Sequence, residues 1–303
     1  MSESLLDPVL AVRGLRKSFG GVHAVDGVEF SVAPGEFVSI IGPNGSGKTT
    51  TVNLISGLLR PDAGTVEVAG QRLRSGSQEA AAGAGIARTF QNGRVFGSLT
   101  VRENVEIGLH TTLTTGRPWQ SLARFPLLRW LPLLAETALA LVPTPAVRAE
   151  RRATDALVDT QLARFSERLA PRAENNAYTL SYANRRRTEI ARALALRPTV
   201  LLLDEPAAGM NQTETAEVGQ QLAELKAAGQ TIVLVEHKLE LVNALSDRVL
   251  VLDEGRVIAE GTPEQIQNDE RVIEAYLGRR RARTRVGDAV AETGTEKVTV
   301  GAD

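Results

Sequence analysis

The sequence predicts an α/β protein built on a mainly parallel sheet with helices on both faces. Two observations support this prediction. Short β-branched or aliphatic runs recur along the chain, and helical patterns lie between several of them. A glycine-rich turn also separates one buried run from the helical pattern that follows it. Strands that alternate with helices in this way are typical of a parallel sheet that is covered on both sides.

The individual elements are predicted from short local patterns. The predicted strands are residues 28–32, 37–41, 65–68, 200–203, 231–235, 249–252 and 256–259. One helix is predicted over residues 49–59, directly after the glycine-rich turn. A second, amphipathic helix is predicted over 214–228, and Gly229 marks its end.

The domain boundaries are predicted where these patterns change. Residues 1–109 and 180–278 hold the strand-rich parts and are predicted to form one core. Residues 110–179 lack strand patterns and are rich in alanine, leucine and arginine, which predicts an inserted helical subdomain; composition alone does not decide whether it is a docking surface. Residues 279–303 have little apolar content, so we expect a disordered tail. Its short arginine cluster either stays solvated or contacts anionic lipid or RNA.

The overall composition excludes several classes of protein. The chain has 303 residues, 43% of them apolar, which is enough for a substantial core. Its formal net charge of −1 gives no global attraction to nucleic acid. Cysteine is absent, which excludes disulfide and thiolate chemistry and fits a reducing cytoplasm. No signal peptide is expected, and the most apolar stretch, residues 125–145, is interrupted by Arg129, Pro132 and Glu136, so it is not predicted to cross a membrane.

The glycine-rich turn carries the P-loop pattern between a buried run and a helix, as that motif requires. Its glycines let backbone N–H groups turn toward phosphate oxygens, and the helix adds the positive end of its dipole. Lys48 is expected to reach the β and γ phosphates, and the Thr49 hydroxyl to bind Mg²⁺. The predicted nucleotide-binding residues here are Gly42, Pro43, Asn44, Gly45, Ser46, Gly47, Lys48, Thr49 and Thr50. A P-loop alone fits a kinase, a GTPase or a helicase equally well.

A pair of carboxylates follows the aliphatic run 200–203. The run ends in Asp204 and Glu205, and Pro206 follows. Two adjacent acids at the end of a buried strand are costly unless they have partners. Asp204 is therefore expected to bind Mg²⁺, and Glu205 to polarise an attacking water. The alternative is a surface turn in which Pro206 simply ends the strand.

Further landmarks follow in the order found in ABC ATPases, and with them the chain resembles that family over roughly residues 10–278. These landmarks are Phe19, Gln91 in RTFQNGRVFGSLTVREN, the segment Leu180-Ser181-Tyr182-Ala183-Asn184, the segment Ala208-Gly209-Met210-Asn211, and His237 in VLVEHKLELV. The resemblance implies an ABC-type ATPase core with a parallel sheet, an antiparallel β subdomain and an inserted helical subdomain.

The resemblance also implies a role for each landmark. Residues 208–211 hold the position of the loop that would cross the dimer interface. Phe19 would stack on adenine. Gln91 would bind Mg²⁺, sense the γ-phosphate and link the core to the helical subdomain. His237 would be the switch histidine, and it would act in hydrolysis with Glu205 and Gln91. The residues that occupy the place of the signature motif LSGGQ would close on nucleotide bound to a second subunit; they are Ser181, Tyr182, Ala183 and Asn184.

Within the family, the chain most resembles the ATP-binding subunits of branched-chain amino acid importers, and urea and amide importer subunits are similar. Three segments carry this likeness: RTFQNGRVFGSLTVREN, DEPAAGMN and GTPEQIQNDERVIEAYLG. The resemblance implies ATP and Mg²⁺ as cofactors, a second ABC ATPase subunit, two permease subunits and, indirectly, a solute-binding protein, but no nucleic acid. It implies a peripheral position on the cytoplasmic face of the cell membrane. An exporter ATPase and a weakly hydrolysing regulatory subunit are the alternatives.

The signature segment departs from the family pattern. Tyr182 and Ala183 replace its two glycines, and Asn184 replaces its glutamine. We expect the Cβ of Ala183 either to crowd the γ-phosphate or to exclude a positive φ. Either effect would make this chain complete its partner's site less well. A soluble ABC protein of DNA repair or translation is not favoured, because the sequence lacks a coiled-coil insertion and a second P-loop.

Overall fold

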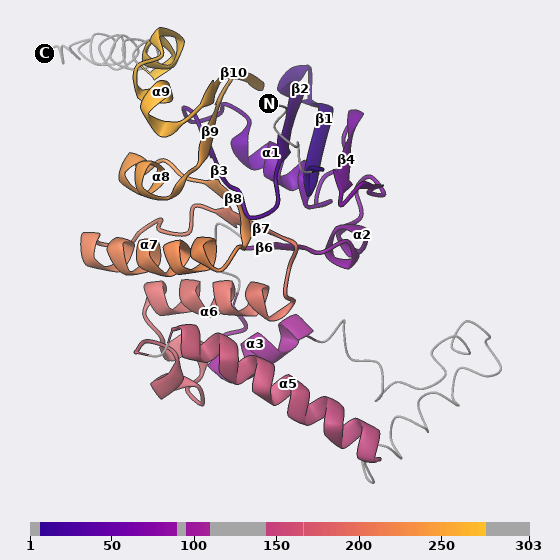
Figure 1. Ribbon diagram of the computed structural model, residues 1–303, viewed down its shortest axis with the longest axis vertical. Helices are drawn as coiled ribbons and strands as arrows, with labels where there is room; N and C mark the ends of the chain where they lie inside the picture. The colour runs from indigo at the N-terminus through magenta and orange to yellow at the C-terminus, as the bar shows by residue number, and fades with distance from the viewer. Residues whose placement is uncertain (1–6, 90–94, 110–143, 166, 277–303) are drawn as a thin grey trace, which may run out of the picture.

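The computed structural model describes residues 7–89, 95–109, 144–165 and 167–276 (Figure 1). The strands are β1 Leu10–Phe19, β2 Val22–Val32, β3 Phe37–Ile41, β4 Ala63–Val68, β5 Gln71–Arg72, β6 Ile86–Arg88, β7 Val200–Asp204, β8 Thr231–Val235, β9 Arg248–Asp253 and β10 Arg256–Gly261. The helices are α1 Lys48–Ile55, α2 Gln78–Gly83, α3 Val101–Leu109, α5 Pro145–Arg164, α6 Tyr182–Ala195, α7 Gln212–Ala227, α8 Leu239–Leu245 and α9 Pro263–Gln267. Two short 3₁₀ helices are η2 Ala170–Arg172 and η3 Ala177–Thr179.

A six-stranded sheet in the order β10-β9-β3-β8-β7-β6 forms the centre of the fold. Only β10 runs antiparallel to its neighbour; the other pairings are parallel. Successive residues of a strand face opposite sides of a sheet. Leu201 and Leu203 therefore belong to one hydrophobic cluster, while Val200 and Leu202 belong to another on the opposite face. The predicted mainly parallel, two-faced α/β architecture is confirmed.

A second, antiparallel sheet in the order β2-β1-β4-β5 covers one side of this centre. Helix α1 lies between the two sheets in Figure 1, and Val52 and Ile55 of α1 are buried in the cluster that the two sheets share. Helices α7 and α8 cover the opposite face, where Val218 and Leu222 of α7 pack against the central strands. The P-loop helix is thus held between two sheets.

Helices α3, α5 and α6 pack together beyond α7 (Figure 1). Val105 on α3, Leu162 on α5 and Ile190 on α6 share one buried cluster with the central sheet. This helical group therefore begins before residue 110 and includes α6, which follows residue 179. The predicted tail and most of the apolar stretch 125–145 lie outside the described residues. Within the described residues, none of the helices has both the length and the apolar character needed to span a membrane.

Several predicted boundaries were wrong, and local geometry explains why. Strands β1 and β6 were missed, and β2 begins six residues before the predicted start. Strand β1 is interrupted by Gly14, whose φ is 56°, and its register with β2 shifts there, which breaks the alternating pattern. Helix α1 ends at Ile55 instead of residue 59. Gly57 takes a φ of 71°, which does not continue a helix.

Candidate active site

The carboxyl ends of β3, β7 and β8 meet at one edge of the central sheet, because these strands are parallel and adjacent. Gly42 follows β3, Glu205 follows β7, and Glu236 follows β8. The topology therefore brings the glycine-rich turn, the carboxylate pair and the loop of His237 to the same edge. In α/β sheets this edge is where ligands bind.

The turn between β3 and α1 leaves no room for side chains at two of its glycines. Gly42 and Gly47 have φ values of 149° and 101°. A Cβ on Gly42 would lie 2.0 Å from the carbonyl oxygen of Leu252, and a Cβ on Gly47 would lie 2.4 Å from that of Ala24. The predicted glycine cradle therefore has the close backbone approach that a phosphate-binding turn requires.

Lys48 places a positive charge inside this turn. It is the first residue of α1 and is buried. Its Nζ donates hydrogen bonds to the carbonyl oxygens of Gly42, at 2.9 Å, and Pro43, at 3.0 Å. The ammonium group and the N-terminal end of α1 thus act at one point, which is the arrangement that attracts phosphate oxygens.

Asp204 is fully buried at the end of β7. Its Oδ2 accepts a hydrogen bond of 3.0 Å from Arg88, which also donates to Asn53 at 2.6 Å and to Ser56 at 2.9 Å on α1 and its cap. Burial raises the pKa of Asp204, and the Arg88 guanidinium opposes that shift. Among the described residues, the Oδ1 of Asp204 has no hydrogen-bond partner. One oxygen is therefore anchored to the P-loop helix while the other is available to a ligand.

Glu205 has a backbone conformation that is uncommon outside glycine. Its φ is 48°, its N–H donates to the Val235 carbonyl at 2.8 Å, and its carbonyl accepts from Ala208 at 3.1 Å. Its Oε1 lies 3.8 Å from Nδ1 of His237, a side chain that is 57% exposed. Positive φ at a non-glycine residue is a strain that is typical of functional sites. The structure therefore brings the predicted catalytic pair Glu205 and His237 side by side.

The structure gives less direct evidence on two other landmarks, Phe19 and Gln91. Phe19 ends β1 and is exposed, and the Lys17 ammonium lies 5.6 Å from its ring centroid. Ala24, on the next strand of the same hairpin, lies against Gly47 of the P-loop. An exposed aromatic ring on this hairpin is compatible with stacking on a base. Gln91 lies outside the described residues.

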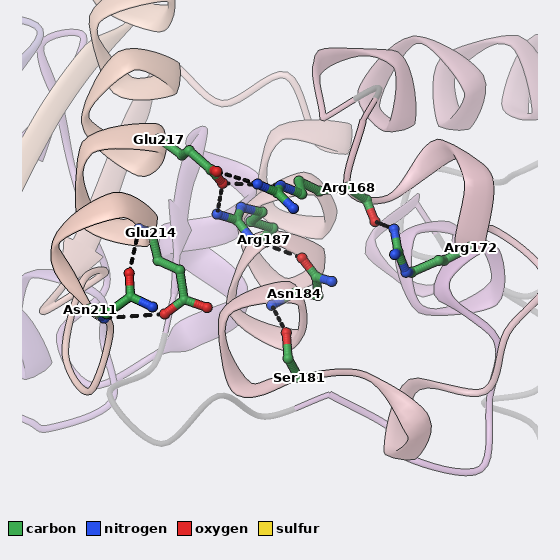
Figure 2. A network of polar contacts seen from close by, with 8 residues as sticks. All are labelled: Arg168, Arg172, Ser181, Asn184, Arg187, Asn211, Glu214 and Glu217. Atoms are coloured by element: carbon green, nitrogen blue, oxygen red, sulfur yellow. Dashed lines mark hydrogen bonds and ion pairs between the residues drawn. The ribbon is translucent and has the colours of Figure 1, made fainter.

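The signature segment forms the beginning of α6. Ser181 caps this helix, and its hydroxyl accepts a hydrogen bond of 3.3 Å from the Asn184 N–H. Figure 2 shows how the segment connects to α7: Arg187 donates to Asn184 at 2.8 Å and to Glu217 at 2.6 Å, and Glu217 also pairs with Arg168. Helix α7 begins directly after Asn211, so one polar network joins the signature segment to the helix that follows residues 208–211.

The backbone of Ala183 agrees with the expected exclusion of a positive φ, whereas the expected crowding of a partner's γ-phosphate stays a prediction. Ala183 lies in the first turn of α6 and does not have a positive φ. Its side chain is buried in the core cluster beside α7. In this conformation the methyl group therefore faces the core and imposes no left-handed strain. Tyr182, in contrast, is exposed and lies close to Gly209.

Sequence reasoning missed four residues at this edge. Arg88 pairs with Asp204, and Arg186 of α6 donates to the Asp204 backbone carbonyl. Glu236 is buried beside His237. Burial raises the pKa of Tyr276, while a hydrogen bond from the Gly42 backbone opposes that shift. A charged residue at the end of a buried run was the available signal for Arg88 and Glu236, since Asp204 was found in the same way.

A P-loop and a carboxylate pair at one edge of a mainly parallel sheet define a P-loop nucleoside triphosphatase. The chain belongs to the ABC transporter ATP-binding family, because the family model described as ABC transporter matches residues 25–208. A second model, described as branched-chain amino acid ATP-binding cassette transporter, matches residues 256–282. The resemblance inferred from the sequence is confirmed.

Relatives and solved structures agree with this assignment. The high-affinity branched-chain amino acid transport ATP-binding protein LivG of Escherichia coli (strain K12) is 40% identical over 273 residues, which cover 89% of this chain and 98% of that protein. The protein BraF of Pseudomonas aeruginosa, with the same description, is 38% identical over 277 residues, with the same coverage. A crystal structure of a nucleotide-free ATP-binding cassette from an ABC transporter is 29% identical, with a TM-score of 0.68, and covers 89% of this chain and 98% of that chain.

Proposed function

We propose that this chain is the ATP-hydrolysing subunit of an ABC importer for branched-chain amino acids or a related small polar solute. The observation that supports the hydrolytic part is the shared sheet edge, from which the turn of Lys48 and the loops of Glu205 and His237 all extend. The solute class rests on the relatives LivG and BraF, which are described as branched-chain amino acid transport proteins, and on the match of residues 256–282. A relative described as a Nod factor export protein is less similar, at 32% identity.

The residues at this edge of the sheet have separate roles in binding and in hydrolysis. The turn from Gly42 to Thr50 and Lys48 bind the phosphates, and Phe19 stacks on the base. Glu205 orients the attacking water and accepts its proton, and His237 contacts the γ-phosphate. Hydrolysis then depends on positioning and charge neutralisation more than on covalent chemistry.

Mg²⁺ fits the residues that are present. Asp204 offers a buried carboxylate oxygen that has no hydrogen-bond partner in the described part of the chain, and Thr49 offers an exposed hydroxyl at the start of α1. These oxygen donors suit a hard cation that is also bound by phosphates. We infer that Thr49, Asp204 and Gln91 hold the ion, which neutralises phosphoryl charge when it is bound.

The working assembly contains a second ATP-binding subunit and two permease subunits. In it, Ser181, Tyr182, Ala183 and Asn184 of one subunit close the nucleotide site of the other. Closure and release of this pair shift the conformation of the permeases through Gln91 and the helical group.

The chain is held at the cytoplasmic face of the membrane by the permeases, and a separate binding protein delivers the solute. The chain is expected to have no nucleic-acid partner. Residues 1–109 and 180–278 supply its ATPase core, and residues 110–179 form the inserted helical subdomain, which docks on the permeases together with the helices α3 and α6 that pack beside it.

The test is Glu205→Gln in the assembled transporter. We expect ATP binding to persist and phosphate release to fall by about 10²- to 10⁴-fold, the range that a general base contributes. Undiminished phosphate release would refute the role of Glu205.

Uptake of labelled leucine into proteoliposomes, competed by valine, urea or acetamide, identifies the solute. Uptake of labelled leucine that is inhibited by none of unlabelled leucine, valine, urea and acetamide would refute the proposed solute class.

A further inference from the structure

Glu236 is a buried carboxylate that the proposed reaction does not use. It follows β8, next to His237, and its side chain is 0% exposed. A buried carboxylate is costly unless its oxygens are paired or hydrogen-bonded. No lysine or arginine among the described residues forms an ion pair with it; the ammonium of Lys238 instead donates to Met210 at 3.2 Å and to Thr215 at 2.7 Å.

Backbone N–H groups from two different loops satisfy this carboxylate. Its Oε2 accepts from His237 at 2.8 Å and from Lys238 at 3.2 Å, both in the loop after β8. Its Oε1 accepts from Ala207 at 3.2 Å, in the loop after β7. Ala207 is two residues from Glu205. The carboxylate therefore joins the loop of the catalytic glutamate to the loop of the histidine.

The two joined loops carry side chains whose relative position matters. Nδ1 of His237 lies 3.6 Å from Oε2 of Glu236 and 3.8 Å from Oε1 of Glu205. Glu205 holds a positive φ, a strain of about 1–3 kcal/mol that persists only where the surroundings fix it. The hydrogen bond from Ala207 to Glu236 holds the backbone two residues after this position.

We propose that Glu236 is a positioning residue for ATP hydrolysis: by bonding both loops, it sets the distance between His237 and Glu205. This inference rests on the proposed hydrolytic function. A glutamine at this position offers one acceptor oxygen, and its amide group would face at least one of the three N–H donors. An aspartate keeps the charge but is one methylene shorter, so it cannot reach both loops from the same backbone position.

The kinetic test compares Glu236→Gln with Glu36→Gln in the assembled transporter. Glu36 is also a partly buried glutamate, but it pairs with Arg248, near the start of β3 at the opposite edge of the sheet. We expect Glu236→Gln to lower kcat by about 10- to 100-fold, because small misplacement of catalytic groups costs that much, and to leave nucleotide affinity within about threefold. Glu36→Gln should leave kcat unchanged. An unchanged kcat in Glu236→Gln overturns the proposal.

A double variant tests whether Glu236 acts by positioning His237 or only through the stability of the protein. If Glu236 acts through His237, the double variant Glu236→Gln with His237→Ala should hydrolyse ATP no more than about threefold more slowly than His237→Ala alone. If the losses in ATP hydrolysis from the two substitutions are fully additive, Glu236 does not act through His237 and the proposal is overturned. Glu236→Asp should show the same kcat defect as Glu236→Gln; restored turnover would mean that only the buried charge matters, which also overturns the proposal.

Hydrogen exchange tests the proposal without any hydrolysis. In the full-length chain, Glu236→Gln should speed amide exchange in both loops, at Ala207 and at His237 and Lys238, whereas Glu36→Gln should not. If protection changes in only one loop, the proposed link is wrong. If the wild-type complex binds nucleotide without hydrolysing it, the proposed function fails, while the exchange experiment still decides whether Glu236 joins the loops. Should Glu236→Gln not fold, Glu236→Asp serves for both measurements.

Discussion

Removing the Glu217 carboxylate should destabilise the protein through Arg187. The Arg187 side chain is 2% exposed, and it donates to Glu217 at 2.6 Å (Figure 2). Burial lowers the pKa of Arg187, and the Glu217 charge opposes this shift. Breaking a fully buried ion pair costs about 3–5 kcal/mol, because it leaves one charge without its partner. Glu217 is 26% exposed, so solvent screens part of this cost, and we expect about 2 kcal/mol for Glu217→Ala.

The matched control is Arg168→Ala, which removes the other partner of Glu217. Arg168 is 45% exposed, so solvent screens its interaction and its loss should destabilise the protein much less than the loss of Glu217. Urea unfolding followed by circular dichroism measures the free energy of unfolding of both variants. In thermal unfolding, at roughly 2 °C per kcal/mol, the Tm of Glu217→Ala should fall by about 4 °C. If Arg168→Ala destabilises the protein as much as Glu217→Ala, the buried guanidinium is not the origin of the effect and the reasoning is refuted.

Two further predictions concern the P-loop and the pH dependence of stability. Gly47→Ala should lower ATP affinity by at least about tenfold, because its Cβ would lie 2.4 Å from a backbone oxygen at a φ of 101°. Gly83→Ala is the control, because no atom of the residues that the structure describes lies within 4 Å of the added Cβ. It should leave ATP affinity unchanged and stabilise α2 by about 0.5–1 kcal/mol; equal nucleotide binding by the two variants would contradict this. Burial raises the pKa of Glu106, and the charge of Asp155 adds to that shift. The contribution of Glu106 to stability is therefore lost as pH rises through its folded pKa. Glu106→Gln should have a higher Tm than the wild type at neutral pH, and this difference in Tm should disappear toward pH ~4, near the ordinary pKa of glutamate. A difference in Tm that does not depend on pH would contradict this explanation.

The sequence predicted the parts of the site that depend on local backbone requirements. The glycine turn and the carboxylate pair stand directly after short buried runs, so their neighbours in the chain are enough to identify them. The structure then places both at one edge of the sheet, together with His237. Local patterns were less informative where a strand is irregular, as in β1, or only three residues long, as in β6.

Only the tertiary structure decided which distant residues meet. Arg88 and Asp204 are 116 residues apart in the chain, and they pair because β6 and β7 are neighbours. Glu236 bonds Ala207 because β7 and β8 are adjacent and end at the same edge. The burial of Ala183 likewise depends on α6 packing beside α7 and not on the signature residues themselves. By itself, the sequence determined which short segments bind phosphate and carry acids, because backbone sterics and burial are encoded locally. The register and order of the strands determined which side chains share a hydrogen bond, because those contacts exist only after the sheet has assembled.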